Sequence, residues 1–215
     1  MTPSADLPTL LLHCPVVPVI VLDDPAQALP LGEALLAGGI TVAEITLRTA
    51  AGLKSIELLT GLPGLLVGAG SVLVADQVDQ VADAGAAFVV SPGLSAEVLD
   101  RCAVRGLPAL PGVATGSDLM AATARGLTEV KIFPANLLGG PAAIRSLSAP
   151  FPGMTLMPSG GVKAENMADY LALDCVPAVS GSWMVDLELI RAGRWDEVTR
   201  LSADAIARAR ASGAA

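Results

Sequence analysis

The sequence is poor in charge, in aromatic residues, in histidine and in clustered cysteine. Charged residues make up 16% of the 215 residues and aromatic residues 3%, whereas hydrophobic residues make up 53%. The single histidine is His13, and the three cysteines, Cys14, Cys102 and Cys175, lie far apart. Such spacing forms neither a disulfide framework nor a zinc motif. We therefore expect no metal and a reduced, cytoplasmic compartment.

Basic clusters and long apolar runs are also missing. The net charge is −8, and without a basic patch we expect neither nucleic acid nor an anionic membrane as a partner. Apolar runs such as residues 16–22 fall well short of the roughly 20 residues that span a bilayer. Residues 1–13 contain no Lys or Arg and do not match a signal peptide. The high apolar content instead favours strands that are covered on both faces.

The residues that are present alternate between two patterns. Short β-branched runs alternate with Ala- and Leu-rich stretches of helical periodicity. The predicted strands are residues 16–22, 42–47, 65–69, 87–91, 108–110, 129–133, 155–158 and 176–180. The predicted helices are residues 4–12, 25–37, 51–62, 75–84, 96–105, 117–125, 141–149, 163–172 and 195–211.

This alternation predicts an α/β fold with a parallel sheet. Eight strand–helix units in roughly 200 residues favour a (β/α)8 TIM barrel. We expect a single domain over residues 1–215, with a short N-terminal segment and an additional C-terminal helix. A doubly wound open sheet is the alternative, but no G-x-G-x-x-G motif follows the first strand.

One lysine lies in an unexpected place. The stretch "LTEVKIFPAN", residues 127–136, has Lys131 in the middle of an apolar run. Strand side chains alternate between faces, which directs Lys131 and Phe133 to the barrel interior. The same parity directs Glu44 and Arg48 of "EITLRT" to that interior. We therefore expect Lys131 and Glu44 to share one enclosed space.

Two interpretations of this pair remain open. Lys131 and Glu44 could form a structural ion pair, although buried pairs add little net stability. Perturbed ionisable groups also gather at functional sites. A desolvated amine can attack a carbonyl to form a Schiff base, and such chemistry needs a proton shuttle. With Lys131 as the nucleophile and Glu44 as the shuttle, this chemistry needs neither a metal nor a cofactor.

Glycine-rich turns follow the last two predicted strands. These turns are "PSGG", residues 158–161, and "SGSW", residues 180–183. Backbone N–H groups at a helix N-terminus bind anions, and the loops after strands seven and eight commonly bind phosphate in this barrel. Together the two turns favour a phosphate site, and the alternative is that the glycines only make tight turns.

These motifs, taken together, resemble one enzyme family. The motifs are "PVVPVIV" at 15–21, "EITLRT" at 44–49, "VGAGSVL" at 67–73, "SPGL" at 91–94, "PGVAT" at 111–115, "KIFPA" at 131–135, "PSGGV" at 158–162 and "GSW" at 181–183. As a set they resemble the 2-keto-3-deoxy-6-phosphogluconate (KDPG) aldolases, which often also act on 4-hydroxy-2-oxoglutarate (KHG). The resemblance covers nearly the whole chain.

The resemblance implies a class I aldolase on a homotrimeric (β/α)8 barrel. Its 2-keto acid substrate would yield pyruvate and glyceraldehyde 3-phosphate, a step of the Entner–Doudoroff pathway. Lys131 would be the Schiff-base lysine and Glu44 the general acid/base. The remaining site residues that it implies are Arg48 and Ser71 at the pyruvate carboxylate, Pro92 shaping that side, Phe133 against the substrate, and Ser159, Gly160, Gly161, Gly181 and Ser182 around the phosphate.

The chain also departs from the family pattern. Ser71 and Ser159 stand where the family usually has Thr, and Ser180 stands where Gly is frequent. Asn136 follows "FPA" where Glu is frequent, and we attach no role to Asn136 or to His13. Serine keeps the hydroxyl and loses a methyl contact, so we expect these changes to affect affinity more than chemistry.

Three other functions remain as alternatives. The related aldolase for the galactonate analogue would share the lysine and the phosphate loops. A phosphate-barrel isomerase or epimerase would use carboxylates without an imine. A non-catalytic sugar-phosphate binder would release no pyruvate.

Overall fold

The computed structural model describes residues 14–212, so His13 and the helix expected over residues 4–12 lie outside the described residues. The strands are β1 (Val16–Ile20), β2 (Val42–Thr46), β3 (Leu66–Gly70), β4 (Val89–Val90), β5 (Ala109–Leu110), β6 (Gly112–Val113), β7 (Glu129–Ile132), β8 (Thr155–Pro158) and β9 (Val179–Gly181). The α-helices are α2 (Ala28–Ala37), α3 (Gly52–Leu59), α4 (Ala75–Asp83), α5 (Ala96–Arg105), α6 (Gly116–Ala124), α7 (Gly140–Ser148), α8 (Met167–Leu171), α9 (Leu187–Arg191) and α10 (Trp195–Ala211). Two short 3-10 helices are η1 (Pro25–Gln27) and η2 (Trp183–Val185).

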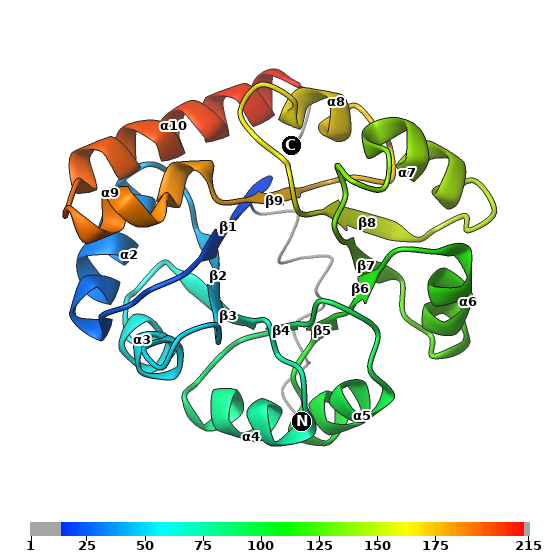
Figure 1. The fold of residues 1–215 in the computed structure, drawn as a ribbon, viewed down its shortest axis with the longest axis horizontal. Coiled ribbons are helices and arrows are strands. Elements are labelled where there is room, and N and C mark those ends of the chain that lie inside the picture. Colours follow the sequence, from blue (N-terminus) through cyan, green and yellow to red (C-terminus); the bar gives the residue numbers. More distant parts are fainter. Residues whose placement is uncertain (1–13, 213–215) are drawn as a thin grey trace.

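The strands curve into a ring, and the helices surround that ring on its outside (Figure 1). Every pairing between the described strands is parallel. The six-stranded sheet has the order β5-β4-β3-β2-β1-β9, and the three-stranded sheet has the order β6-β7-β8. The predicted α/β class and parallel order are therefore confirmed.

The hydrogen-bonded ladder is divided into two sheets instead of forming one closed set of eight strands. At one junction the strand expected over residues 108–110 continues past Pro111 as β6. Proline has no N–H to donate to a ladder, so it separates β5 from β6. At the other junction a single parallel bridge joins Ser159 to Ser180, between the ends of β8 and β9.

Most predicted helices are confirmed to within a few residues, with two differences near the last strands. The helix expected over residues 163–172 forms only from Met167 to Leu171, because residues 164–166 make a turn. The short helices η2 and α9 follow β9 and were not expected. The C-terminal helix α10 is confirmed, and its Thr199 donates a hydrogen bond to the Ala34 carbonyl of α2 at 3.0 Å.

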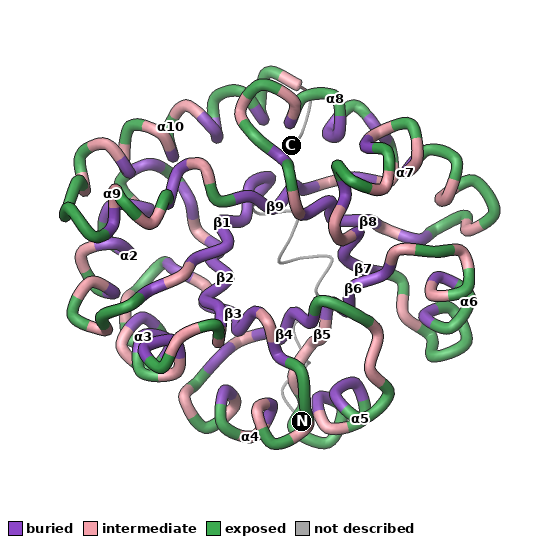
Figure 2. Tube along the Cα trace, in the orientation of Figure 1, coloured by how far each residue is buried: buried purple, intermediate pink, exposed green. Residues whose placement is uncertain are grey.

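Burial follows the ring (Figure 2). The strands are buried along nearly their whole length, whereas buried and exposed residues alternate along the helices. Strands covered on both sides account for the continuous apolar runs of the sequence. Within residues 14–212, no helix combines the length and apolar character needed to cross a membrane.

Candidate active site

Lys131 and Glu44 form a buried pair across the inside of the ring. The Lys131 amine lies 3.3 Å from each of the two Glu44 carboxylate oxygens. The two side chains are 5% and 0% exposed. They come from β7 and β2, which belong to different sheets. The parity prediction that both side chains point inward is therefore confirmed.

A glycine of the neighbouring strand makes room for the Glu44 carboxylate. Glu44 is in register with Gly68 on β3, and a Cβ atom at Gly70 would lie 2.2 Å from Glu44 Oε1. Only glycine at position 70 leaves the carboxylate where it meets Lys131. The sequence prediction missed this role, although the alternating glycines of "VGAG" were a usable signal.

Arg48 and Ser71, which the resemblance places at the substrate carboxylate, lie side by side. The Arg48 Nε atom donates a hydrogen bond to the Ser71 hydroxyl at 3.0 Å. Ser71 has a φ of 58°, in the left-handed region that few residues other than glycine adopt. Residues held in such a conformation cluster at functional sites.

Pro92 does not line the cavity that holds Arg48, Phe133 and the glycine turns. It is exposed in the loop after β4. A Cβ atom at Gly112 would lie 2.2 Å from the Pro92 carbonyl oxygen, so this loop packs on the start of β6. The structure thus places Pro92 near the break between the two sheets.

A cavity of about 380 Å³ opens at the carboxyl ends of the strands. Its lining residues are Val19, Val21, Arg48, Phe133, Ser159, Gly160, Gly161, Val162, Gly181, Ser182, Val185, Asp186 and Leu187. All five residues expected around the phosphate belong to this lining, together with Arg48 and Phe133. The Phe133 ring centroid is 5.6 Å from the Lys131 amine, so the buried pair lies next to the cavity.

The loop after β8 is shaped by two glycines and one asparagine. Gly160 and Gly161 have φ values of 89° and 81°. Asn166 accepts a hydrogen bond from Lys163 N at 2.8 Å and donates one to the Gly161 carbonyl at 3.0 Å. The expectation of a helix N-terminus directly after "PSGG" is wrong, because α8 begins only at Met167. The backbone N–H groups of the loop itself, and not those of a helix N-terminus, are therefore the groups that an anion would meet here.

The hydroxyl groups at the end of β8 and β9 also meet. Ser159 donates a hydrogen bond to the Ser180 hydroxyl at 3.4 Å, and both residues are buried. The lining by Val185, Asp186 and Leu187 was not expected, although these residues follow the "SGSW" turn by only two to four positions. Within residues 14–212, no three His, Cys, Asp or Glu side chains gather in a way that could hold a metal ion.

Comparison with known proteins decides the family. Residues 8–201 match the family model described as KDPG and KHG aldolase. The chain belongs to the KDPG and KHG aldolase family. It is therefore an aldolase, a carbon–carbon lyase, as the sequence motifs predicted.

Individual members of the KDPG and KHG aldolase family match over nearly their whole length. The 2-dehydro-3-deoxy-phosphogluconate aldolase of Pseudomonas aeruginosa is 44% identical, over 95% of this chain and 94% of that protein. The KDPG aldolase of Legionella pneumophila, solved with pyruvate captured as a covalent carbinolamine intermediate, is 41% identical with a TM-score of 0.87, over 90% of this chain and 94% of that one. The Zymomonas mobilis enzyme, solved with 3-phosphoglycerate, is 37% identical with a TM-score of 0.89, over 95% and 96%.

Proposed function

We propose that this protein is a class I aldolase that cleaves KDPG to pyruvate and glyceraldehyde 3-phosphate and also acts on KHG. The observation that carries the proposal is the buried Lys131 amine, 3.3 Å from the Glu44 carboxylate. It lies beside a cavity whose lining includes the five residues expected around the phosphate. The covalent pyruvate adduct of the Legionella relative and the 3-phosphoglycerate of the Zymomonas relative support the same chemistry.

Lys131 acts first in the proposed reaction, and Glu44 acts second. The uncharged Lys131 amine attacks the C2 carbonyl of the substrate, and loss of water leaves a protonated imine. Glu44 takes the proton of the C4 hydroxyl as the C3–C4 bond breaks, and the bonding electrons move into the imine. The enamine then takes a proton at C3, and water releases pyruvate and frees the lysine.

The two ends of the cavity hold the two ends of the substrate in this proposal. Arg48 and Ser71 bind the carboxylate next to the keto group, where the guanidinium is suited to a planar anion. Phe133 packs against the carbon chain, and Pro92 shapes the side near the carboxylate. Ser159, Gly160, Gly161, Gly181 and Ser182 surround the phosphate through hydroxyl and backbone N–H groups.

We extend the proposal to the assembly and setting of the enzyme. The strands act as one (β/α)8 barrel within a single domain, and the Ser159–Ser180 bridge across one junction supports this. The enzyme is a cytoplasmic homotrimer that needs no metal or cofactor and serves the Entner–Doudoroff pathway. Equilibrium sedimentation of the full chain tests the trimer.

Borohydride trapping tests the chemistry directly. Incubation with pyruvate and borohydride should add one reduced pyruvate to the peptide that holds Lys131, because reduction fixes the imine. Lys131→Arg should abolish turnover, since a guanidinium stays protonated. Lys54→Arg is the matched control, because Lys54 is exposed and pairs with Glu57 on its own helix. Labelling at Lys54 or Lys163, or no labelling of active protein, would overturn the assignment.

A coupled assay of pyruvate release separates the remaining alternatives. The phosphogluconate, phosphogalactonate and hydroxyoxoglutarate substrates should be compared on one preparation. Of the two phosphorylated epimers, KDPG is expected to have the higher kcat/KM. A preference for the galactonate epimer would reassign the substrate, and isomerisation without pyruvate release would replace the aldolase assignment.

A further inference from the structure

The lining of the cavity offers a phosphate no surplus of positively charged side chains. Arg48 is the one basic residue among the lining residues, and Asp186 is the one acidic residue. The Lys131–Glu44 pair beside the cavity adds one charge of each sign. A phosphate dianion in this cavity would therefore share its lining with the carboxylate residue Asp186.

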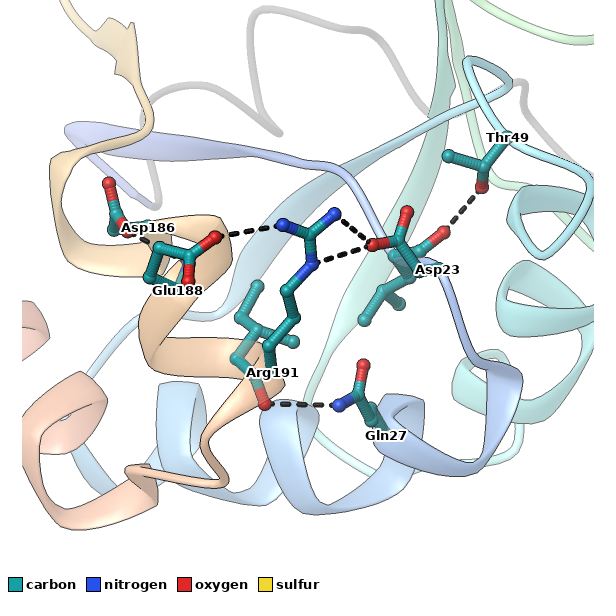
Figure 3. Close-up of polar contacts among 8 residues, drawn as sticks. Asp23, Gln27, Thr49, Asp186, Glu188 and Arg191 are labelled. Atoms are coloured by element: carbon teal, nitrogen blue, oxygen red, sulfur yellow. Dashed lines mark hydrogen bonds and ion pairs between the residues drawn. The ribbon is translucent and has the colours of Figure 1, made fainter.

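The Asp186 side chain is held in place by the start of α9. Its Oδ1 atom accepts a hydrogen bond from Glu188 N at 2.9 Å, which caps the helix and leaves Oδ2 available (Figure 3). An N-cap of this kind fixes the rotamer of the capping residue. The hydrogen bond therefore restrains the carboxylate of a residue that belongs to the cavity lining.

The helix that Asp186 caps is itself tied to the loop after β1. Arg191 Nη2 lies 2.6 Å from Asp23 Oδ2, and its Nη1 lies 2.8 Å from Glu188 Oε1 (Figure 3). Gln27 Nε2 donates to the Ile190 carbonyl at 3.1 Å. The contacts of Arg191 thus go to Asp23 and Glu188, and within the described residues no cation pairs with Asp186.

We propose that Asp186 makes this cavity accept the uncharged, hydroxylated tail of unphosphorylated 2-keto-3-deoxy sugar acids and weakens its binding of a phosphate dianion. The inference rests on the proposed aldolase function and adds a second substrate class to it. A carboxylate is a pure hydrogen-bond acceptor, so a terminal hydroxyl matches Asp186 Oδ2 whereas phosphate oxygens do not. Hydrogen bonds to an ionised acceptor are also stronger than neutral ones.

The bond changes are the same for the new substrate class. The C3–C4 bond breaks, the C4 hydroxyl gives up its proton and becomes the aldehyde, and C3 takes a proton after the electrons pass through the imine. The products are pyruvate and glyceraldehyde in place of glyceraldehyde 3-phosphate. No oxidant, reductant or co-reactant other than water is required.

The test compares kcat/KM for 2-keto-3-deoxygluconate and for KDPG in three proteins. The wild type should release pyruvate from both. Asp186→Asn keeps the N-cap but removes the charge. It should lower about tenfold the ratio of kcat/KM for 2-keto-3-deoxygluconate to kcat/KM for KDPG. Asp24→Asn is the control, since Asp24 caps η1 with the same 2.9 Å geometry and lies outside the cavity lining.

Each outcome decides the inference. A ratio that does not fall in Asp186→Asn, or that falls equally in Asp24→Asn, overturns it. Cleavage of KDPG alone by the wild type overturns it while leaving the proposed function intact. If the wild type shows neither pyruvate release nor imine trapping, the proposed function is wrong, and the inference is wrong with it.

Discussion

The Lys131 amine is equidistant from the two oxygens of the Glu44 carboxylate, at 3.3 Å from each. Both distances exceed the 2.7–2.9 Å or so that is usual for a charge-assisted hydrogen bond. The carboxylate therefore faces the amine without a tight bond to it, and both side chains are buried. A substrate carbon bound to the amine would remain within reach of the carboxylate, either directly or through one water.

Glu44→Gln should separate proton transfer from imine formation. General acid–base groups typically contribute about 10²–10⁴-fold to a rate, so we expect kcat to fall by roughly that factor. Slow trapping of pyruvate by borohydride should persist, because Lys131 remains. Glu57→Gln is the control, since Glu57 also pairs with a lysine but is exposed.

The same sample tests the purely structural role of Glu44. If Glu44 only neutralised Lys131, its loss would leave a buried charge and cost about 3–5 kcal/mol of the free energy of unfolding. Thermal unfolding and pyruvate release should therefore be measured together. A destabilised protein whose folded fraction keeps full activity would contradict the catalytic assignment.

Gly70→Ala should displace the Glu44 carboxylate. The added methyl group would lie 2.2 Å from Glu44 Oε1, so the end of that side chain must shift. Because small misplacements of reacting groups can cost about 10²-fold, we expect a kcat loss of roughly tenfold or more. Gly116→Ala, whose Cβ atom would meet nothing within 4 Å, should keep its activity. Wild-type kcat in Gly70→Ala would show that the position of Glu44 is unimportant.

Gly161→Val should act mainly on the phosphorylated substrate. Gly161 has a φ of 81°, and its Cβ atom would lie 2.4 Å from the Asn136 Cβ atom. A β-branched residue there would distort the loop that Asn166 holds. We expect a large loss of kcat/KM with KDPG and a smaller one with KHG. Gly153→Val is the control for backbone strain alone, because Gly153 has a φ of 87° and open space around it. Equal losses on both substrates would mean that the glycines only shape the turn.

Asp118 should make stability depend on acid pH. The N–H of Ala114 and then the hydroxyl and N–H of Thr115 lower the pKa of Asp118 in the folded protein. Since the folded pKa lies below the unfolded one, the stabilisation is present above the ordinary pKa of about 4 and is lost as pH falls through the folded value. Asp118→Ala should therefore lower the free energy of unfolding at pH 7, and the difference from wild type should shrink in acid.

Denaturant unfolding from pH 7 down to pH 3 checks this prediction. Asp76→Ala is the control, because Asp76 also lies in the first turn of a helix but makes no side-chain hydrogen bond among the described residues. A difference between wild type and Asp118→Ala that is constant across this pH range would contradict the assigned cause.

The sequence alone determined the alternation of strands and helices, the direction of the key side chains and the chemistry they support. The two-residue period of a strand is a local backbone property, so parity directed Lys131 and Glu44 inward without any tertiary information. The glycine turns after the last two strands likewise indicated residues that line one cavity. The family motifs then joined these features into an aldolase, and the comparisons confirmed the family.

Only the tertiary structure decided which residues meet across the ring. The contact between Gly70 and Glu44 depends on the register between β2 and β3, and that between Lys131 and Glu44 joins residues 87 positions apart. The placement of Asp186 at the cavity depends on α9, a helix too short for its period to be visible in the sequence. Such contacts are set by how the strands curve and how loops pack on one another, and no local pattern carries that information.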